Sequence, residues 1–486
     1  MSSTSNRPLT LHPDRLFSPE PIQRDIAREL HAEIAELPLL CPHGHTDPRW
    51  FADNEPFENA ADLLITPDHY LVRMLYSQGV PLEALGIAPR DVDAAGGPGE
   101  VVASPRDVWR TFAEHFHLFR GTPSGFWMNH VLSDVFGIDT RLTRETADAN
   151  YDRIAECLTD DAFRPRALLD RFGIEVVATT DGALSDLAHH QRLAAEGFAG
   201  RVIPTFRPDS VVDPDHEVYA DHVQRLGEIT GRDTTRWDDY LAALFDRRKL
   251  AISLGATATD HGHPSAYTAS VDAATAQHLL DGALAGTLDA SGKETLRGQV
   301  LVEMAAMSIE DGLVMQLHPG SHRNHNRPLY ERFGRDIGAD IPGPIDYVDG
   351  LHALLNRFGN DPGFRMVAFT LDETTFSREL APLAGHYPAL YLGPPWWFLD
   401  SVEGMLRFRR AVTETAGFAN TTGFVDDTRA FLSIPARHDV ARRVDCRYLA
   451  ELVSDHRLEL DEAHEIAHEL AVGLPRRVFN LRPPEA

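Results

Sequence analysis

Two histidines separated by one residue, His43 and His45, are the side chains of this sequence best placed to bind a metal ion. Side chains two positions apart on an extended segment point to the same face. Both imidazoles can therefore ligate one divalent ion from one side. The alternative is a pair of loop histidines in a chain that contains 24 of them. The position of the pair after a short apolar run, Leu39–Cys41, favours the metal site.

Asp427 is the carboxylate that would complete such a site, because it follows the last apolar run of the chain, Gly423–Val425. In a closed barrel the last strand lies beside the first, so Asp427 could join the two histidines or act as a base beside the ion. The alternative is a helix N-cap, since Asp427 precedes Thr-Arg-Ala-Phe-Leu. For Asp427 alone the cap is the simpler interpretation, but together with His43 and His45 the metal site is favoured.

Three arginines, Arg207, Arg323 and Arg429, each follow a predicted strand. A guanidinium group can bind a carboxylate through two parallel hydrogen bonds. Any one of the three could form a surface ion pair, but three on one face predict a site for an anionic ligand. The formal net charge of −27 would repel such a ligand, so local arginines are needed. The same charge argues against a nucleic-acid partner, which requires a basic face.

Other candidate side chains are more ambiguous. His318 could be a metal ligand, a proton donor or a buried histidine with satisfied hydrogen bonds, and the neighbouring pair Asp260 and His261 is a further candidate. Trp396 and Trp397 could offer a ring face to the C–H groups of a sugar, although packing in the core is the simpler interpretation.

The few cysteines and lysines restrict the chemistry. Cys41, Cys157 and Cys446 are far apart and form no CxxC pair, which argues against a disulfide framework or a thiolate zinc site. The only lysines are Lys249, which precedes a predicted strand, and Lys293, which lies in a helical or loop region. Neither position suits a bridging carbamate or a Schiff base. We therefore expect a mononuclear metal site held by histidine and carboxylate.

The elements that must position these residues are short apolar runs that end in polar residues, as parallel strands buried on both faces do. The eight runs are Leu39–Cys41, Val176–Thr179, Arg201–Thr205, Ala251–Gly255, Val314–Leu317, Met366–Thr370, Leu390–Leu392 and Gly423–Val425. A doubly wound sheet would usually have a glycine-rich phosphate loop after its first strand, and His-Gly-His-Thr-Asp-Pro is not one. The pattern predicts an α/β fold, a (β/α)8 TIM-like barrel with functional groups at the strand ends.

The interval between the first two runs is much longer than one crossover helix requires. Residues 50–165 have helical periodicity and are expected to form a helical insertion after the first strand, within a single (β/α)8-barrel catalytic domain spanning residues 1–486. No apolar run approaches the roughly 20 residues of a membrane helix. The first residues lack the apolar stretch of a secretory signal, so a cytoplasmic location is expected.

Together these residues resemble the uronate isomerase (glucuronate isomerase) family, a branch of the amidohydrolase superfamily. The resemblance extends from about Leu39 to Arg443. The matching segments are His43-x-His45, Asp68-His69-Tyr70, Thr179-Thr180-Asp181, Pro204-Thr205-Phe206-Arg207-Pro208-Asp209, Asp260-His261, His318-Pro319-Gly320-x-x-Arg323-Asn324-x-Asn326, Trp396-Trp397-Phe398 and Asp427-x-Arg429-x-Phe431-Leu432-Ser433 with Arg437-His438. Gly44, Thr46 and His325 depart from the family pattern, and these departures concern the choice among sugar acids.

The resemblance implies conversion of D-glucuronate to D-fructuronate, and of D-galacturonate to D-tagaturonate, by C2-to-C1 proton transfer through an enediol. It implies one divalent metal bound by His43, His45 and Asp427. Zn²⁺ is the default for histidine and carboxylate ligands, and manganese, iron or cobalt would also fit. In the implied mechanism Asp427 is the base, Tyr70 is the acid and Arg429 stabilises the enediolate. The implied substrate-binding residues are His69, Arg207, His318, Arg323, Trp396 and Trp397.

We therefore expect a small acidic sugar as the partner, no nucleic acid and no membrane, and the sequence leaves a homo-oligomer open. One rival function is a mononuclear metal-dependent hydrolase of the same superfamily, acting on a sugar lactone, amide or ester. A second rival is a sugar-acid sensor or structural protein that kept the barrel and lost its chemistry. The joint presence of the metal ligands with Tyr70 and Arg429 argues against the second.

Overall fold

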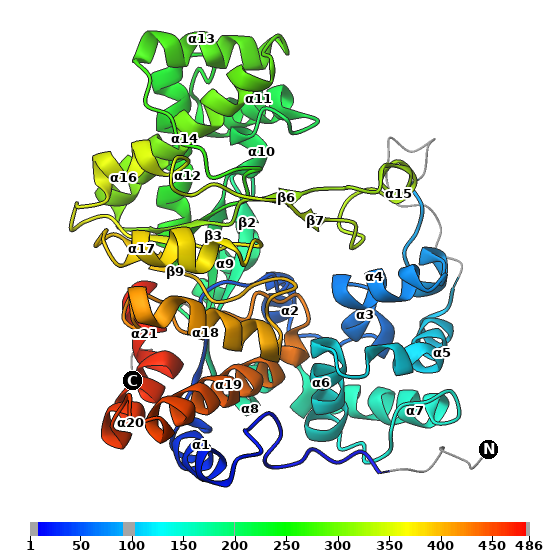
Figure 1. The fold of residues 1–486 in the computed structure, drawn as a ribbon. Coiled ribbons are helices and arrows are strands. Elements are labelled where there is room, and N and C mark those ends of the chain that lie inside the picture. Colours follow the sequence, from blue (N-terminus) through cyan, green and yellow to red (C-terminus); the bar gives the residue numbers. More distant parts are fainter. Residues whose placement is uncertain (1–7, 91–102, 199, 483–486) are drawn as a thin grey trace.

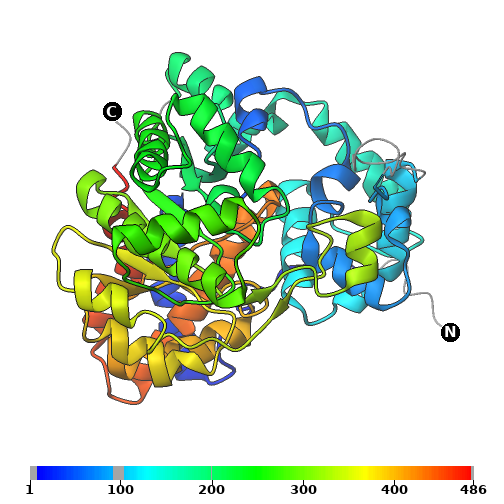
Figure 2. The same ribbon diagram turned by 90° about the horizontal axis from the view of Figure 1, so that it is seen from above.

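The computed structural model describes residues 8–90, 103–198 and 200–482, and its centre is a parallel sheet (Figure 1). Seven strands lie in the order β1-β2-β3-β4-β5-β8-β9. Their bounds are β1 Leu39–Cys41, β2 Ile174–Gly182, β3 Val202–Arg207, β4 Ala258–His261, β5 Val314–Leu317, β8 Met366–Ala368 and β9 Leu390–Leu392. The sheet curls and helices surround it, as the view from above shows (Figure 2), which confirms the predicted α/β, barrel-like fold.

The predicted fourth strand, Ala251–Gly255, is wrong. Most of it belongs to the last turn of α12 (Trp237–Ser253), and the strand β4 begins at Ala258. The apolar residues before Gly255 lie at the end of this helix and not in a strand. The true strand contains Thr259, Asp260 and His261, all fully buried although polar. Hydropathy alone could not identify this strand, because its polar side chains are buried.

The predicted eighth strand, Gly423–Val425, is also wrong as a regular strand, although its segment lies between β9 and β1. Leu392 of β9 forms one parallel bridge to Thr421, and the His45 N–H donates to the Thr428 carbonyl at 3.0 Å. Gly423 and Asp427 have positive φ angles of +73° and +40°, which interrupt extended backbone. The barrel is therefore closed here by single contacts.

Helices occupy the chain between β1 and β2. They are α2 Pro48–Asp53, α3 Ala60–Leu64, α4 His69–Ser77, α5 Pro105–His115, α6 Pro123–His130, α7 Ala147–Leu158 and α8 Pro165–Arg171, with short helical turns η1 Leu82–Leu85, η2 Phe116–Phe119, η3 Val131–Val135 and η4 Asp161–Phe163. In Figure 1 α3 to α7 lie to one side of the sheet. The interpretation of residues 50–165 as an insertion within one catalytic domain stays a prediction, and part of that range lies outside the described residues.

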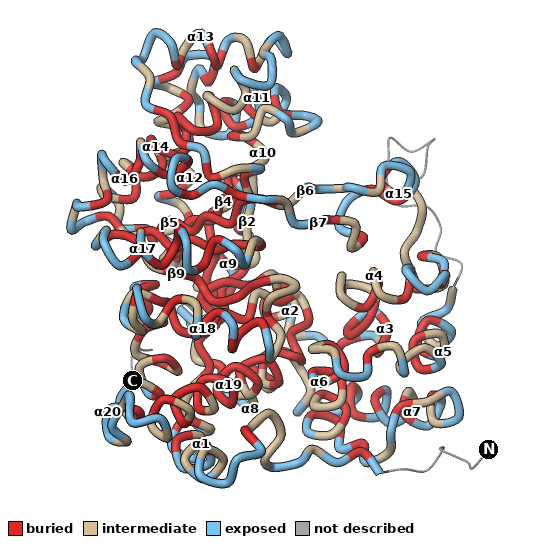
Figure 3. The backbone as a smooth tube through the Cα atoms, viewed as in Figure 1, coloured by how far each residue is buried: buried red, intermediate tan, exposed pale blue. Residues whose placement is uncertain are grey.

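The remaining helices cover the barrel. They are α1 Pro21–Ile34, α9 Ala188–Ala195, α10 Asp209–Val212, α11 Tyr219–Thr230, α12, α13 Ala273–Leu284, α14 Ala290–Asp311, α16 His352–Phe358, α17 Ala381–Ala384, α18 Val402–Ala416, α19 Ile434–Ser454, α20 Leu460–His468 and α21 Leu474–Val478, with turns η5 Phe376–Leu380, η6 Phe431–Ser433 and η7 Glu469–Gly473. Buried residues concentrate along the strands and the inner helix faces (Figure 3). Among residues 8–90, 103–198 and 200–482, none of these helices has the length and apolar character needed to span a membrane.

An arm that the sequence did not predict extends from the barrel towards α4 (Figure 1). It consists of the antiparallel pair β6 (Ser321–His322) and β7 (Ile341–Pro342) with α15 (Arg327–Phe333) between them. At its far end the Arg90 N–H donates to the Arg332 carbonyl at 2.7 Å, and the Arg332 side chain pairs with Glu83. The arm thus joins the barrel to the helices on its side.

Candidate active site

A cavity of about 1120 Å³ lies at the carboxyl ends of the strands, where barrel enzymes carry their functional groups. The further candidates Asp260 and His261 are not in its lining, but the eleven site residues that the resemblance implied all line it: His43, His45, His69, Tyr70, Arg207, His318, Arg323, Trp396, Trp397, Asp427 and Arg429. They come from the carboxyl ends of β1, β3, β5 and β9, from the arm, from the segment that closes the barrel and from the start of α4. The fold therefore brings together side chains that are up to several hundred positions apart.

The atoms of His43, His45 and Asp427 converge on one point. The Oδ1 atom of Asp427 lies 3.2 Å from His43 Nε2 and 3.0 Å from His45 Nε2. Asp427 Oδ1 is buried, and it forms no hydrogen bond with correct geometry among the described residues. Two imidazoles and a carboxylate that converge without hydrogen-bond geometry fit a divalent ion. This cluster is a candidate metal site.

The charges of this cluster depend on one another. Burial alone would raise the pKa of Asp427, but the imidazoles of His43 and His45 hold it well below its usual range. Burial alone would lower the pKa of His43, but the carboxylates of Asp260 and Asp427 raise it to about 9. For His45 burial dominates and the pKa is lowered. The Asp427 carboxylate is therefore ionised and able to bind a cation or accept a proton.

The loops that carry Asp427 and the tryptophans have unusual backbone geometry. Asp427, Trp397 and Phe398 have positive φ angles of +40°, +31° and +68°, which non-glycine residues adopt rarely and at a cost. The Trp396 indole N–H donates to Asp427 Oδ2. Trp396 is 8% exposed and lines the cavity. The sequence left open whether this residue packs in the core or lines the site, and the structure shows that it does both.

His318, Asp260 and Arg207 form a second group beside the histidine pair. His318 Nε2 lies 2.6 Å from Asp260 Oδ1, and Arg207 Nη1 lies 3.3 Å from Asp260 Oδ2. Arg207 Nε also donates to Asp209 at 2.7 Å. Asp260 is fully buried, but the charges of His318, Arg207 and His43 hold its pKa well below its usual range. His318 is therefore anchored by a buried carboxylate while it lines the cavity.

Tyr70 is held by a residue that the sequence analysis missed, Asp400. The Tyr70 hydroxyl donates to Asp400 Oδ1 at 2.6 Å and accepts from the Phe398 N–H at 2.8 Å. Arg437 Nη1 donates to Asp400 Oδ2 at 3.2 Å. Burial, followed by the charge of Asp400, raises the pKa of Tyr70 well above its usual value. No motif marked Asp400, although it lies only three positions after Trp397.

The Asp68 side chain places Tyr70 and His69 at the start of α4. It caps the helix by accepting hydrogen bonds from the N–H groups of Tyr70 and Leu71 at 2.8 and 3.2 Å. His69 is thereby directed to the cavity wall, where burial lowers its pKa to about 4. Its ring is neutral at physiological pH and suits hydrogen bonding better than charge pairing.

The two remaining arginines pair with carboxylates of the arm. Arg323 Nη1 lies 2.8 Å from Asp340 Oδ2, and Arg429 Nη2 lies 3.6 Å from Asp336 Oδ1. Both arginine side chains are 40% exposed, so they remain accessible to a small anion. Asp336 and Asp340 lie on the arm and line the cavity, and nothing in the sequence pattern distinguished them from surface acids.

Comparison with known proteins gives one consistent result. A family model described as glucuronate isomerase matches residues 21–479. A uronate isomerase from Xanthomonas euvesicatoria pv. vesicatoria (strain 85-10) is 58% identical over 473 residues, covering 97% of this chain and 99% of the relative. One from Phenylobacterium zucineum (strain HLK1) is 55% identical, covering 98% of both. The crystal structure of glucuronate isomerase from Caulobacter crescentus is similar, with a TM-score of 0.95, 54% identity, and coverage of 98% of this chain and 99% of that one. The uronate isomerase structure from Thermotoga maritima has a TM-score of 0.88 at 28% identity, covering 97% and 99%.

Proposed function

We propose that the cavity around His43, His45 and Asp427 is the active site of an isomerase. The chain belongs to the glucuronate isomerase family, and it is therefore an enzyme that interconverts the aldose and ketose forms of uronates. The substrates we propose are D-glucuronate, giving D-fructuronate, and D-galacturonate, giving D-tagaturonate. The observation that supports this proposal is the convergence of two histidines, a carboxylate and three arginines on one cavity.

We propose that His43, His45 and Asp427 hold one divalent ion, and that this ion is Zn²⁺, the usual choice for histidine and carboxylate donors. Such an ion, when bound, orients the oxygens of a substrate and stabilises negative charge on them. Everything else in the proposal concerns the side chains of this chain.

Asp427 is proposed as the base that takes the C2 proton of the open-chain aldose. The electron pair of the C2–H bond forms the C1–C2 double bond, O1 gains a proton, and a cis-enediol results. Loss of the proton on O2 and protonation of C1 then give the ketose. Arg429, which lies on the same loop as Asp427, would stabilise the negative charge that develops on the oxygens.

Tyr70 is proposed to move protons between O1 and O2, in exchange with Asp400. Its hydroxyl already donates to Asp400 at 2.6 Å, so a proton taken from a substrate hydroxyl can displace the phenolic proton onto that carboxylate. The reverse transfer returns a proton to the other oxygen. Burial raises the pKa of Asp400, which favours its acceptance of a proton.

The substrate carboxylate is proposed to bind Arg207 and Arg323, with His69, His318, Trp396 and Trp397 contacting the rest of the sugar acid. Arg207 is partly buried beside carboxylates, and burial alone would lower its pKa, but Asp209 and Asp260 raise it, so its charge is secure. Arg323 is more exposed and shares the arm with its partner Asp340. A carboxylate with two oxygens can bridge both guanidinium groups.

The test is proton NMR in heavy water with D-glucuronate and D-galacturonate, using protein with and without added zinc and a sugar lactone as the control for hydrolysis. We expect ketose signals from at least one uronate, and no hydrolysis of the lactone. Deuterium at C1 would support proton exchange through the enediol, whereas retained protium would indicate an internally shuttled proton. Folded, metal-loaded protein that converts neither uronate would contradict the proposal.

A further inference from the structure

A second His-Gly-His sequence, His261-Gly262-His263, begins at the last residue of β4 and repeats the spacing of His43-Gly44-His45 after β1. The mutual geometry of the rings is also similar. The ring centroids are 5.4 Å apart at 86° in the first pair and 6.0 Å apart at 84° in the second. Two barrel strands thus end in the same arrangement of imidazoles, and the reaction proposed above uses only one of them.

A carboxylate completes the second group, as Asp427 completes the first. One ligand atom from each of Asp209, His261 and His263 can be chosen so that all three lie within 4.8 Å of one another. His261 is fully buried and His263 is 4% exposed. The atoms His261 Nδ1 and His263 Nε2 have no hydrogen-bond partner among the described residues. Two buried imidazoles with free nitrogens beside a carboxylate form a donor set for a divalent transition-metal ion.

The hydrogen bonds around these donors orient them. His261 Nε2 lies 3.0 Å from Thr259 Oγ1, which leaves its Nδ1 free. The Gly262 N–H lies 3.1 and 3.3 Å from the two oxygens of Asp209, and Arg207 Nε lies 2.7 Å from Oδ2. An ionised carboxylate offers about four acceptor positions, so these contacts leave lone pairs for an ion. Partners of this kind commonly orient ligating groups.

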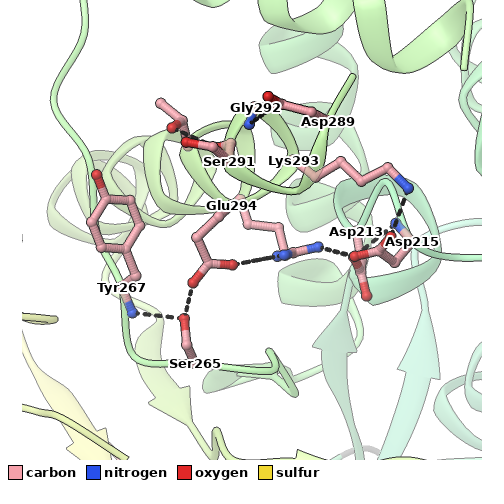
Figure 4. Close-up of polar contacts among 11 residues, drawn as sticks. Asp213, Asp215, Ser265, Tyr267, Asp289, Ser291, Gly292, Lys293 and Glu294 are labelled. Atoms are coloured by element: carbon pink, nitrogen blue, oxygen red, sulfur yellow. Dashed lines mark hydrogen bonds and ion pairs between the residues drawn. The ribbon is translucent and has the colours of Figure 1, made fainter. Parts of the chain in front are cut away.

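The two loops that supply the donors are fixed by the first turns of α14 (Figure 4). Arg297 donates to Asp213 at 2.9 Å and to Asp215 at 2.7 Å, on the loop after Asp209. It also donates to Glu294 at 2.7 Å, and Glu294 accepts from Ser265 on the loop after His263. The loops after β3 and β4 are therefore cross-linked before any ligand binds, which lowers the entropic cost of assembling a site.

The charge around the two rings also suits a cation. The carboxylates of Asp209, Asp213, Asp260 and Glu294 act on the two rings, against the guanidinium groups of Arg248 and Arg297 and that of Arg207, which donates to Asp209. His261 Nδ1 and His263 Nε2, which have no hydrogen-bond partner among the described residues, are the ring atoms available to an ion. Arg207 is the cation nearest to the donors, and its charge is shared between Asp209 and Asp260.

We propose that Asp209, His261 and His263 bind a second divalent transition-metal ion, distinct from the one at His43 and His45. Asp209 and Gly262 line the cavity, so an ion can reach the site from the same opening. Because Asp209 also holds Arg207, the second ion fixes the position of that arginine. Its presence does not depend on the isomerase reaction.

The test counts ions in purified full-length protein that has been stripped with a chelator, dialysed and reloaded with Zn²⁺. Elemental analysis should give two ions per chain for the wild type, one for H263N, one for H45N and none for the double variant. H190N is the matched control, because His190 is an equally buried histidine whose Nε2 lies 2.9 Å from Thr179 Oγ1 and which belongs to no ligand cluster. It should retain both ions.

A second measurement keeps the test independent of folding losses in H263N. Co²⁺ is titrated into H45N, where the first site is disabled, and its visible d–d absorption should saturate at one equivalent. Circular dichroism of each variant without metal verifies that it is folded. A wild type that reloads one ion, or an H45N variant whose cobalt absorption does not appear, would overturn the proposal and leave the His43 site unaffected.

Discussion

At the level of single residues, Asp427 is held by constraints from three directions. Its backbone has a φ of +40°, its Oδ2 accepts the indole N–H of Trp396, and its Oδ1 faces the nitrogens of His43 and His45. A side chain fixed in this way loses little entropy when it reacts, and strained backbone persists only where the surroundings enforce it. The position of this carboxylate is therefore set before a substrate arrives.

Replacing Asp427 by Asn should lower kcat for D-glucuronate by at least about 100-fold, because the amide cannot take a proton at C2. Asn is nearly the same size and its oxygen can still accept from Trp396, so the urea midpoint should change little. Isothermal titration should show that uronate still binds. A kcat within tenfold of the wild type would place the base elsewhere.

The contact between Tyr70 and Asp400 predicts coupled effects on catalysis. D400N should lower kcat by about 10- to 100-fold, because the partner of the phenol can no longer accept its proton. If the two side chains act as one proton relay, Y70F combined with D400N should lose no more than the more damaging single variant. A structural role for Asp400 alone would instead give losses that multiply.

Asp181, at the end of β2, provides a pH-dependent prediction. Burial raises its pKa from 3.8 to about 6 in the folded protein. The folded state therefore favours the protonated form of Asp181. The free energy of unfolding of the wild type falls as pH rises from about 4 through 6, and it stays lowered by the full amount at higher pH. D181N mimics the protonated form and should raise the free energy of unfolding by about 2–3 kcal/mol at pH 8.

Urea denaturation of D181N at pH 4 and pH 8 checks this prediction, since the gain should nearly vanish at pH 4. The Thr179 hydroxyl, which donates to Asp181 Oδ2 at 2.6 Å, can donate to the amide oxygen equally well. An equal gain at both pH values would mean that the pKa of Asp181 is not raised.

At the level of elements, the sequence was informative where a strand is apolar and ends in a motif. β1, Leu39–Cys41, and β5, Val314–Leu317, match their predicted bounds, and each leads directly to site histidines. β4 was missed because Thr259, Asp260 and His261 are polar residues that are fully buried. The arm was missed because its two strands have two residues each and their pairing depends on contacts with distant helices.

Gly320, where the arm begins, should not tolerate a side chain. Its φ is +87°, and a Cβ there would collide with the side chain of Ile345. G320A should lower the free energy of unfolding by about 2–4 kcal/mol, combining a left-handed backbone penalty with overpacking. It should also raise KM, because Arg323 follows three residues later on the displaced arm.

G137A is the matched control for this effect. Gly137 also has a positive φ, +65°, but no atom lies within 4 Å of the added Cβ. It should cost only about 1–2 kcal/mol and leave KM unchanged. Urea denaturation and steady-state kinetics compare the two variants, and equal effects would mean that the contact with Ile345 is unimportant.

At the level of the whole molecule, the first and last parts of the chain hold the barrel closed. The segment between β9 and β1 contributes single backbone contacts in place of a ladder. Behind it, α1 packs against α19 and α20, which lie together at one end of the molecule in Figure 1. The sequence analysis predicted no pairing between these helices, because the contact joins residues about 400 positions apart.

Arg442 of α19 makes the central polar contact of this closure. It donates to the carbonyls of Ile34 and Ala35 at 2.8 Å, and to those of Leu37 and Pro38 at 2.9 Å. These carbonyls lie at the end of α1 and in the turn into β1, where no helical partner exists. Arg442 is only 5% exposed, and its removal takes away the side-chain donor of all four carbonyls, of which that of Ile34 keeps only the Leu37 N–H at 3.2 Å.

Replacing Arg442 by Met preserves much of the aliphatic volume and should lower the free energy of unfolding by at least about 3 kcal/mol, because several buried carbonyls lose their only side-chain donor. R410M is the control, since Arg410 is 49% exposed, pairs with Glu451 at 2.7 Å and lies on the neighbouring helix α18. Its loss should cost less than about 1 kcal/mol.

Urea denaturation of both variants at one pH compares them directly. If R442M is no more destabilising than R410M, the barrel is closed by apolar packing between α1 and α19, and the arginine contributes little to holding the two ends of the chain together.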